Sequence, residues 1–132
     1  YEGSEIMKKQ IIKVTGCPEA IGPYSQAVKA NDLLFVSGNL PIDVETGKIV
    51  DGGIEKQTHM TLKNISVLLD GAGLSLNDIV KTTIFIKDMN DFPKVNSVYA
   101  EYFTCDYPAR STVEVSKLPK DALIEIECIA KY

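Results

Sequence analysis

Two segments with the apolar periodicity of helices lie between segments that alternate like β-strands, and this pattern constrains the fold more than any other feature of the sequence. The first helix is predicted over residues 53–70, and Gly71 or Gly73 is expected to end it. The second is predicted over residues 92–103, where aromatic and valine side chains form one apolar face. Both helices are therefore expected to pack on a sheet.

Strand-like segments precede, separate and follow the two predicted helices, in the order β-β-β-α-β-α-β-β. Residues 11–14 form a short predicted strand, and residues 26–30 and 33–37 form a predicted hairpin with a two-residue turn. Residues 41–53, which are rich in aspartate and glycine, are expected to be a loop.

The second half of the chain contains the clearest strand, over residues 79–87. Its even-numbered side chains from 80 to 86 are predicted to share one face, and its odd-numbered side chains the other. Two further strands are predicted over residues 110–116 and 122–130. A mixed sheet with two helices packed on one face is an α+β fold, here in a single domain.

The face of the sheet that the helices leave uncovered is expected to carry a mixture of polar and apolar groups. Thr83 and Phe85 are placed there together with Arg110, Thr112 and Glu114, or with the alternate residues of that strand. Mixed faces of this kind are often buried by self-association around a symmetry axis. The sequence therefore predicts an oligomer.

A chain of 132 residues is long enough for one domain with its own core, predicted over residues 7–132. Met7 is interpreted as the natural start, which makes residues 1–6 a cloning remnant. No apolar run approaches the ~18 residues that cross a bilayer, and the N-terminus lacks the apolar segment of a signal peptide. Three cysteines without C-x-x-C spacing predict a reducing compartment, and hence a cytoplasmic protein.

Metal and nucleic-acid sites find little support in the composition. The single histidine, His59, lies at the edge of the first helix's apolar stripe and is interpreted as solvated rather than as the partner of a catalytic cysteine. Together with the widely spaced Cys17, Cys105 and Cys128 it gives no metal-ligand spacing, so no metal is predicted. A net charge of −4 without a long basic run makes nucleic acid an unexpected partner.

Arg110 is the only arginine among the fourteen basic residues. A solitary guanidinium in a lysine-rich chain indicates a need for a planar, two-pronged donor at that position. Pro108 places Arg110 at the mouth of a predicted strand, from which it can extend into a cleft and bind a carboxylate through two charge-assisted hydrogen bonds. An ion pair with Glu114 or another surface acid is the alternative interpretation.

The last strand alternates strictly, and Glu125 and Glu127 share its polar face. Such a pair is ordinarily a solvated face. If the two closing strands pair antiparallel, however, Arg110 and Glu125 border one pocket, within one subunit or across an interface. A glutamate enclosed there has its pKa raised by desolvation, which suits general acid–base catalysis near neutrality.

Four short motifs occur in a fixed order along the chain: IGPYSQA at 21–27, VSGNLP at 36–41, PARS at 108–111, and LPKD followed by IEIE within 118–127. In this combination the chain resembles the Rid family of reactive intermediate deaminases, also called YjgF-type proteins, and within it the archetypal RidA-like subgroup. The resemblance covers residues 7–132.

This resemblance implies a chorismate-mutase-like α+β fold and homotrimers around a central barrel, with three clefts between subunits. It also implies an enzyme, a 2-iminobutanoate/2-iminopropanoate deaminase. Such an enzyme hydrolyses 2-imino acids, in equilibrium with 2-enamino acids such as 2-aminoacrylate, to 2-oxo acids and ammonia. Its partners are a small imino or oxo acid and other copies of itself, and no membrane. No cofactor is implied, because an imine is already electrophilic.

Site residues follow from the resemblance position by position. Arg110 is implied to bind the substrate carboxylate, and Glu125 to be the acid near the attacking water. Pocket-lining positions match Tyr24, Ser37, Gly38 and Asn96. Structural roles for these four in the backbone, the core or the helix surface stay open. Where many relatives have cysteine this chain has Thr112, whose backbone carbonyl is implied to hold the water.

Two other functions remain open from the sequence. A protein that binds 2-oxo acids without turnover, as a regulator, would use the same arginine and need no acid–base group. An endoribonuclease or translation inhibitor is the second alternative, against which the acidic charge argues.

Overall fold

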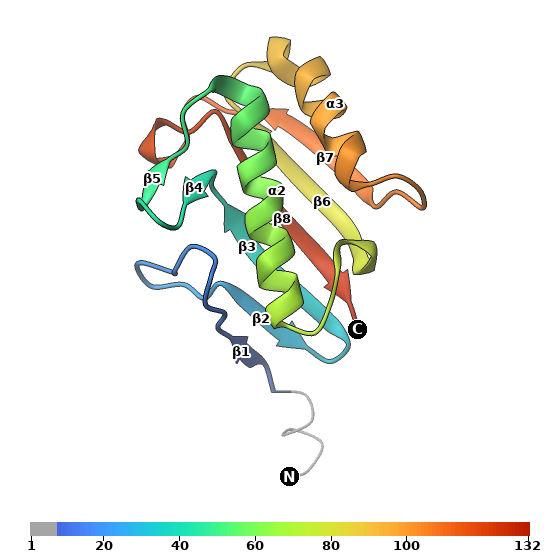
Figure 1. The fold of residues 1–132 in the computed structure, drawn as a ribbon. Coiled ribbons are helices and arrows are strands. Elements are labelled where there is room, and N and C mark those ends of the chain that lie inside the picture. The colour runs from blue at the N-terminus through green and yellow to red at the C-terminus, as the bar shows by residue number, and fades with distance from the viewer. Residues whose placement is uncertain (1–7) are drawn as a thin grey trace.

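The computed structural model describes residues 8–132, and the predictions about residues 1–6 lie outside this range. Six strands form one mixed sheet in the order β1-β2-β3-β8-β6-β7 (Figure 1). These strands are β1 (Gln10–Ile12), β2 (Ala27–Ala30), β3 (Leu33–Asn39), β6 (Ile79–Ile86), β7 (Ala109–Glu114) and β8 (Ile124–Lys131). The helices α2 (Gly53–Gly71) and α3 (Phe92–Tyr102) cover one face, so the predicted α+β architecture is confirmed.

The predicted hairpin is the β2–β3 pair, in which Ala30 lies opposite Leu33. Asn31 takes the left-handed conformation that its turn requires, with φ of 55°. The predicted loop over residues 41–53 is partly wrong, because β4 (Ile42–Asp43) and β5 (Lys48–Ile49) form a small separate hairpin there. The Asp43 carboxylate accepts a hydrogen bond from the Glu45 amide at 2.9 Å, and this local turn closes the hairpin.

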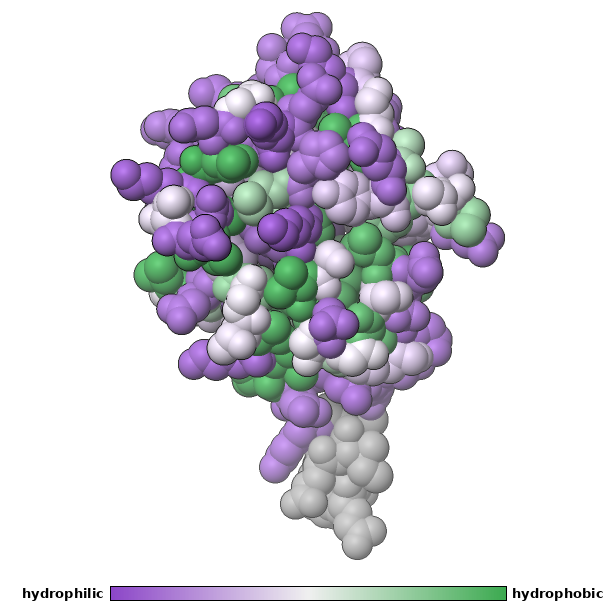
Figure 2. Space-filling model, viewed as in Figure 1, coloured by the Kyte–Doolittle hydropathy of each residue, from purple (hydrophilic) through white to green (hydrophobic). Residues whose placement is uncertain are grey.

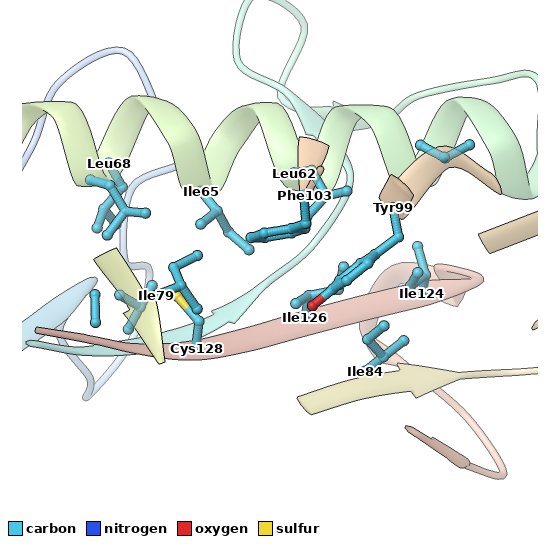
Figure 3. Close-up of a cluster of buried hydrophobic side chains, with 14 of the residues drawn as sticks. Leu62, Ile65, Leu68, Ile79, Ile84, Tyr99, Phe103, Ile124, Ile126 and Cys128 are labelled. Carbon is cyan, nitrogen blue, oxygen red and sulfur yellow. The ribbon is translucent and has the colours of Figure 1, made fainter. Parts of the chain in front are cut away.

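The core lies between the two helices and the sheet, and the periodicity of α2 places its apolar residues there. Leu62, Ile65 and Leu68 point from α2 toward the buried side chains of the central strands (Figure 3). The helix begins at Gly53 and ends at Gly71, as predicted, and Gly73 then takes a left-handed conformation.

One strand departs from simple alternation. Val80 was expected on the core face of β6, yet its side chain is 44% exposed, while Ile79 is buried. The register between β6 and β8 shifts between Ile79 and Lys81, so an irregularity of the bulge type moves Val80 out of the core. From Thr82 onward the alternation is as predicted.

The two closing strands are not neighbours, so the antiparallel pairing that the sequence left open does not occur. β7 pairs in parallel with β6 at the edge of the sheet, and β6 separates it from β8. The reason is α3, which connects β6 to β7 as a crossover and therefore returns the chain in the same direction. Arg110 pairs with the buried Thr82, and Ser111 and Val113 take the other face.

The two faces of the sheet differ in character. Seen from the helix side, the surface is mostly hydrophilic (Figure 2). On the uncovered side, one row of paired positions crosses the whole sheet and is largely apolar. Its members, from β1 to β7, are Ile11, Val28, Phe35, Ile129, Lys81 and Ala109. Among residues 8–132, neither helix has the length and apolar character of a membrane span.

Candidate functional site

Arg110 lies near the start of the edge strand β7, with its side chain on the face that α3 covers. Its Nη1 donates a hydrogen bond to Oδ1 of Asn96 at 2.8 Å. Its guanidinium carbon lies 4.9 Å from the ring centre of Tyr99 and 5.1 Å from that of Phe92. The cation is therefore in contact with two aromatic rings and one amide.

An open cavity of about 430 Å³ lies beside this guanidinium. Its lining consists of Asn96, Tyr99, Ala100, Tyr107, Pro108 and Arg110. The alternative ion pair with Glu114 does not form, because that carboxylate accepts a hydrogen bond from the Met89 amide at 2.8 Å. Within residues 8–132 the ion pairs join other side chains, so the positive charge of Arg110 has no acidic partner there.

Glu125 lies on β8, opposite Phe85 and on the uncovered face of the sheet. Its carboxylate fills the space beside Gly38 of β3, where a Cβ would overlap it. Burial raises the pKa of the Glu125 carboxyl above its ordinary value, and the charge of Glu127 raises it further. A carboxyl group in this state can take up and release a proton nearer to neutral pH.

Tyr24, Ser37 and Gly38 lie together, and Gly38 joins this group to Glu125 because the Glu125 carboxylate fills the space beside it. All three line a small cavity of about 50 Å³ between β3 and the loop before β2. The Ser37 hydroxyl donates to the Ser25 carbonyl at 2.6 Å, and Tyr24 is 54% exposed. These residues and Glu125 form one cluster, which we call the glutamate cluster.

The remaining candidates belong to a second group, the arginine cluster, made of Arg110, Asn96 and Thr112. Thr112 lies opposite the buried Ile84, on the same face of the sheet as Arg110. Glu125 of the glutamate cluster lies on the opposite face, and β6 separates β7 from β8. One chain thus brings the predicted site residues together in two groups and does not join them.

Two features of the site were missed from the sequence. Phe92 and Tyr99 were expected only to pack on the sheet, and they also flank the guanidinium. Gln26 holds the loop that carries Tyr24: it accepts from the Val14 amide at 2.7 Å and donates to the Pro18 carbonyl at 2.8 Å. Its place within the first motif was the only signal.

Within residues 8–132, no hydrogen bond or ion pair joins a cysteine or His59 to Arg110 or Glu125. Cys17 and Cys128 are buried, and burial, reinforced by the charge of Glu127, raises the pKa of Cys128 to about 12, which keeps its thiol protonated. Cys105 is exposed. His59 contacts the Tyr102 hydroxyl at 3.1 Å through Nδ1. Among the described residues no group of three or more acidic, cysteine or histidine side chains is arranged to hold a metal.

Residues 14–132 match the family model described as Endoribonuclease L-PSP. A solved structure from Yersinia pestis, described as a conserved Rid protein family member of unknown function, is 52% identical with a TM-score of 0.92, covering 95% of this chain and all of that one. The chain belongs to the Rid family. The resemblance in the four motifs is thereby confirmed.

Of two curated relatives in the Rid family, one carries only a general family name and the other is named for its reaction. The RutC family protein PH0854 of Pyrococcus horikoshii is 57% identical over 92% of this chain and 97% of its own length. The 2-iminobutanoate/2-iminopropanoate deaminase of Mus musculus is 42% identical over 96% of this chain and 93% of its own. Rid relatives of similar length thus include a named imine deaminase.

Proposed function

We propose that the protein is a deaminase that hydrolyses reactive 2-imino acids, such as 2-iminobutanoate, to 2-oxo acids and ammonia. The observation that carries the proposal is the Arg110 guanidinium, which borders a cavity and has no acidic partner among residues 8–132. A cation of this kind binds the carboxylate that every 2-imino acid carries. The mouse relative's name supports the same reaction.

The mechanism that we propose needs one positioned cation and one acid–base group. Arg110 orients the substrate through its carboxylate and so presents C2 of the imine. Water attacks C2 while Glu125 accepts its proton, and the C=N double bond becomes a single bond. Glu125 returns this proton to nitrogen, then takes the proton of the new C2 hydroxyl and passes it to the amino group as well. The C–N bond then breaks, and ammonia leaves as the carbonyl forms. One general acid–base group contributes roughly 10²–10⁴-fold, in addition to the effect of positioning the substrate.

Joining the two clusters requires a second copy of the chain. Arg110 and Glu125 lie on opposite faces of the sheet in one protomer, so we propose that a site combines the arginine cluster of one copy with the glutamate cluster of its neighbour. The exposed apolar row on the uncovered face supplies a surface for that association. A homotrimer closes the arrangement and gives three equivalent sites.

The proposal also concerns where the protein works. Cys17, Cys105 and Cys128 are all free thiols, which fits a reducing compartment such as the cytoplasm. Substrates of this kind arise there whenever a dehydratase releases an enamine product.

The test is a coupled assay in which a pyridoxal-phosphate-dependent threonine dehydratase generates 2-iminobutanoate and the release of 2-oxobutanoate is followed. The wild type should accelerate release above the spontaneous rate. Arg110→Lys should fail nearly as badly as Arg110→Ala, since an ammonium cannot reproduce the planar two-pronged contact. Lys117→Ala, which removes an exposed cation elsewhere, serves as the control. Wild-type rates in Arg110→Ala would refute the assignment.

The printed description of the family model keeps ribonuclease activity as a second candidate. The same preparations should be incubated with RNA after repeated purification. RNA cleavage that tracks the protein and survives Arg110→Ala would favour this candidate. Binding of 2-oxobutanoate without any acceleration of imine hydrolysis would instead favour a regulatory binding protein.

A further inference from the structure

The three groups that contact the Arg110 guanidinium come from one face of one helix. Phe92, Asn96 and Tyr99 occupy positions i, i+4 and i+7 of α3, and this spacing places them side by side on a helix surface. All three present a group to the same cation: Phe92 and Tyr99 each present a ring, and Asn96 presents a carbonyl oxygen.

The side chain of Tyr99 is itself held in place by contacts in the core. Its side chain points from α3 into the core and is only 5% exposed (Figure 3). Its hydroxyl and that of Thr82 form a hydrogen bond of 2.9 Å, and Phe103 packs against its ring with the centres 4.4 Å apart. Thr82 is the direct cross-strand partner of Arg110. The ring that lies against the guanidinium is thus tied to the strand next to it.

Asn96 supplies a neutral acceptor. A guanidinium has five N–H donors, and Asn96 accepts a hydrogen bond from one of them, on Nη1. An aspartate at the same position would reach the same nitrogen but would neutralise the cation and compete with a carboxylate ligand. An amide therefore orients the group while its positive charge and its remaining donors stay available.

We propose, resting on the function proposed above, that Asn96 and Tyr99 are positioning residues for Arg110. They act through the guanidinium: Tyr99 supports one of its flat faces, Asn96 sets its rotation, and its outer edge is left to bind the substrate carboxylate. A preorganised fork loses less freedom when the ligand binds.

The single arginine of this chain allows a direct test in the absence of any substrate. Protein labelled with ¹⁵N-arginine, without arginine in a tag, gives one Nε–Hε signal in NMR, and exchange between its Nη groups reports rotation of the guanidinium. The wild type should show slow rotation. Asn96→Ala and Tyr99→Leu should each speed it, whereas Tyr99→Phe keeps the ring and should stay close to the wild type. Tyr102→Phe removes a hydroxyl elsewhere on α3 and is the matched control.

Ligand affinity is the second readout. Asn96→Ala and Tyr99→Leu should weaken 2-oxobutanoate binding about 5- to 20-fold and raise the KM for the imine by a similar factor. The value of kcat should change much less, because a contact to the carboxylate is made equally in the ground state and the transition state. Asn96→Asp should bind more weakly than Asn96→Ala, since its charge competes with the ligand.

The outcomes separate this inference from the proposed function. If hydrolysis is absent but the arginine signal and 2-oxobutanoate binding change as expected, positioning holds and the deaminase proposal fails. If Asn96→Ala leaves the rotation of Arg110 unchanged, Asn96 is not a positioning residue, whatever its effect on activity. If a folded Tyr99→Leu protein also leaves the rotation of the guanidinium unchanged, the Tyr99 ring does not position Arg110. Should Tyr99→Leu fail to fold, Asn96→Ala and Asn96→Asp still decide whether a contact from α3 positions the Arg110 guanidinium.

Discussion

Gly38 shows how a single residue can serve a site by what it lacks. Its backbone does not adopt the left-handed conformation that favours glycine, so conformational freedom is not the reason for its presence. The missing side chain instead leaves the space that the Glu125 carboxylate fills. The resemblance marked Gly38 as part of the pocket, but this physical role depends on the approach of β3 and β8.

We expect Gly38→Ala to reduce imine hydrolysis about 10²-fold while changing the free energy of unfolding by less than about 1 kcal/mol. The added methyl displaces only the flexible end of Glu125, so the fold adapts but the acid–base group moves. Gly47→Ala provides the contrast: its φ of 73° makes the substitution strained, and nothing lies near its Cβ. It should lose stability and keep activity. Rates and urea unfolding of both variants check this pair.

Glu125 also makes stability depend on pH. Because burial raises its pKa in the fold, protonation is favoured in the folded state over the unfolded state. Its contribution to stability is therefore complete below the ordinary glutamate pKa and is lost as the pH rises through the raised value. Glu125→Gln removes the buried charge at neutral pH with almost the same shape.

Urea unfolding should accordingly find Glu125→Gln more stable than the wild type at pH 7, and this gain should disappear near pH 4. Glu45→Gln, in the exposed β4–β5 turn, is the matched control variant. A gain of the same size at both pH values would contradict the assignment of the effect to the ionisation of Glu125.

At the scale of elements, alternation and helical spacing were enough to predict most strands and both helices. They could not predict which strands are neighbours, because pairing depends on the direction of the crossover through α3. The same limit explains Val80, whose exposure depends on a register shift against a distant strand. It also explains why Arg110 could be predicted as a site residue, because it is the only arginine of the chain, whereas its contacts with Phe92 and Tyr99 could not be predicted.

The contact between α3 and β6 contains one buried polar pair, Tyr99 and Thr82. Thr82→Val leaves the Tyr99 hydroxyl without a partner and should lower the free energy of unfolding by about 1–3 kcal/mol. Adding Tyr99→Phe removes the orphaned group, so the double variant should regain most of the loss. Urea titrations of the single and double variants measure this, and a Thr82→Val protein as stable as the wild type would show that the hydroxyls are not coupled.

For the whole molecule, the uncovered face of the sheet is the feature with the widest effect. Phe35 is 43% exposed at the centre of an apolar row, which is an unusual position for a large side chain in an isolated domain. The sequence predicted an oligomer from the number of helices available to cover the sheet. It could not place Arg110 and Glu125 on opposite faces, because that depends on the order of the strands.

If the proposed homotrimer of 14.5 kDa chains forms through this face, Phe35→Glu should convert it into monomers, because the substitution introduces a charge into the surface that association would bury. Light scattering coupled to gel filtration measures the mass, and circular dichroism checks that the monomer is folded. Val44→Glu, at an exposed apolar residue beyond the row, is the control and should stay associated. A folded Phe35→Glu protein of unchanged mass would show that this face is not the interface.

The placement of Arg110 and Glu125 on opposite faces has a genetic consequence. If each crevice takes its arginine from one copy and its glutamate from the next, two inactive alleles need not be inactive together. In an equal mixture of Arg110→Ala and Glu125→Gln chains that exchange freely, about one quarter of the crevices combine two intact partners. Such alleles would complement each other, whereas the mixture would have no activity if each site were contained in one chain.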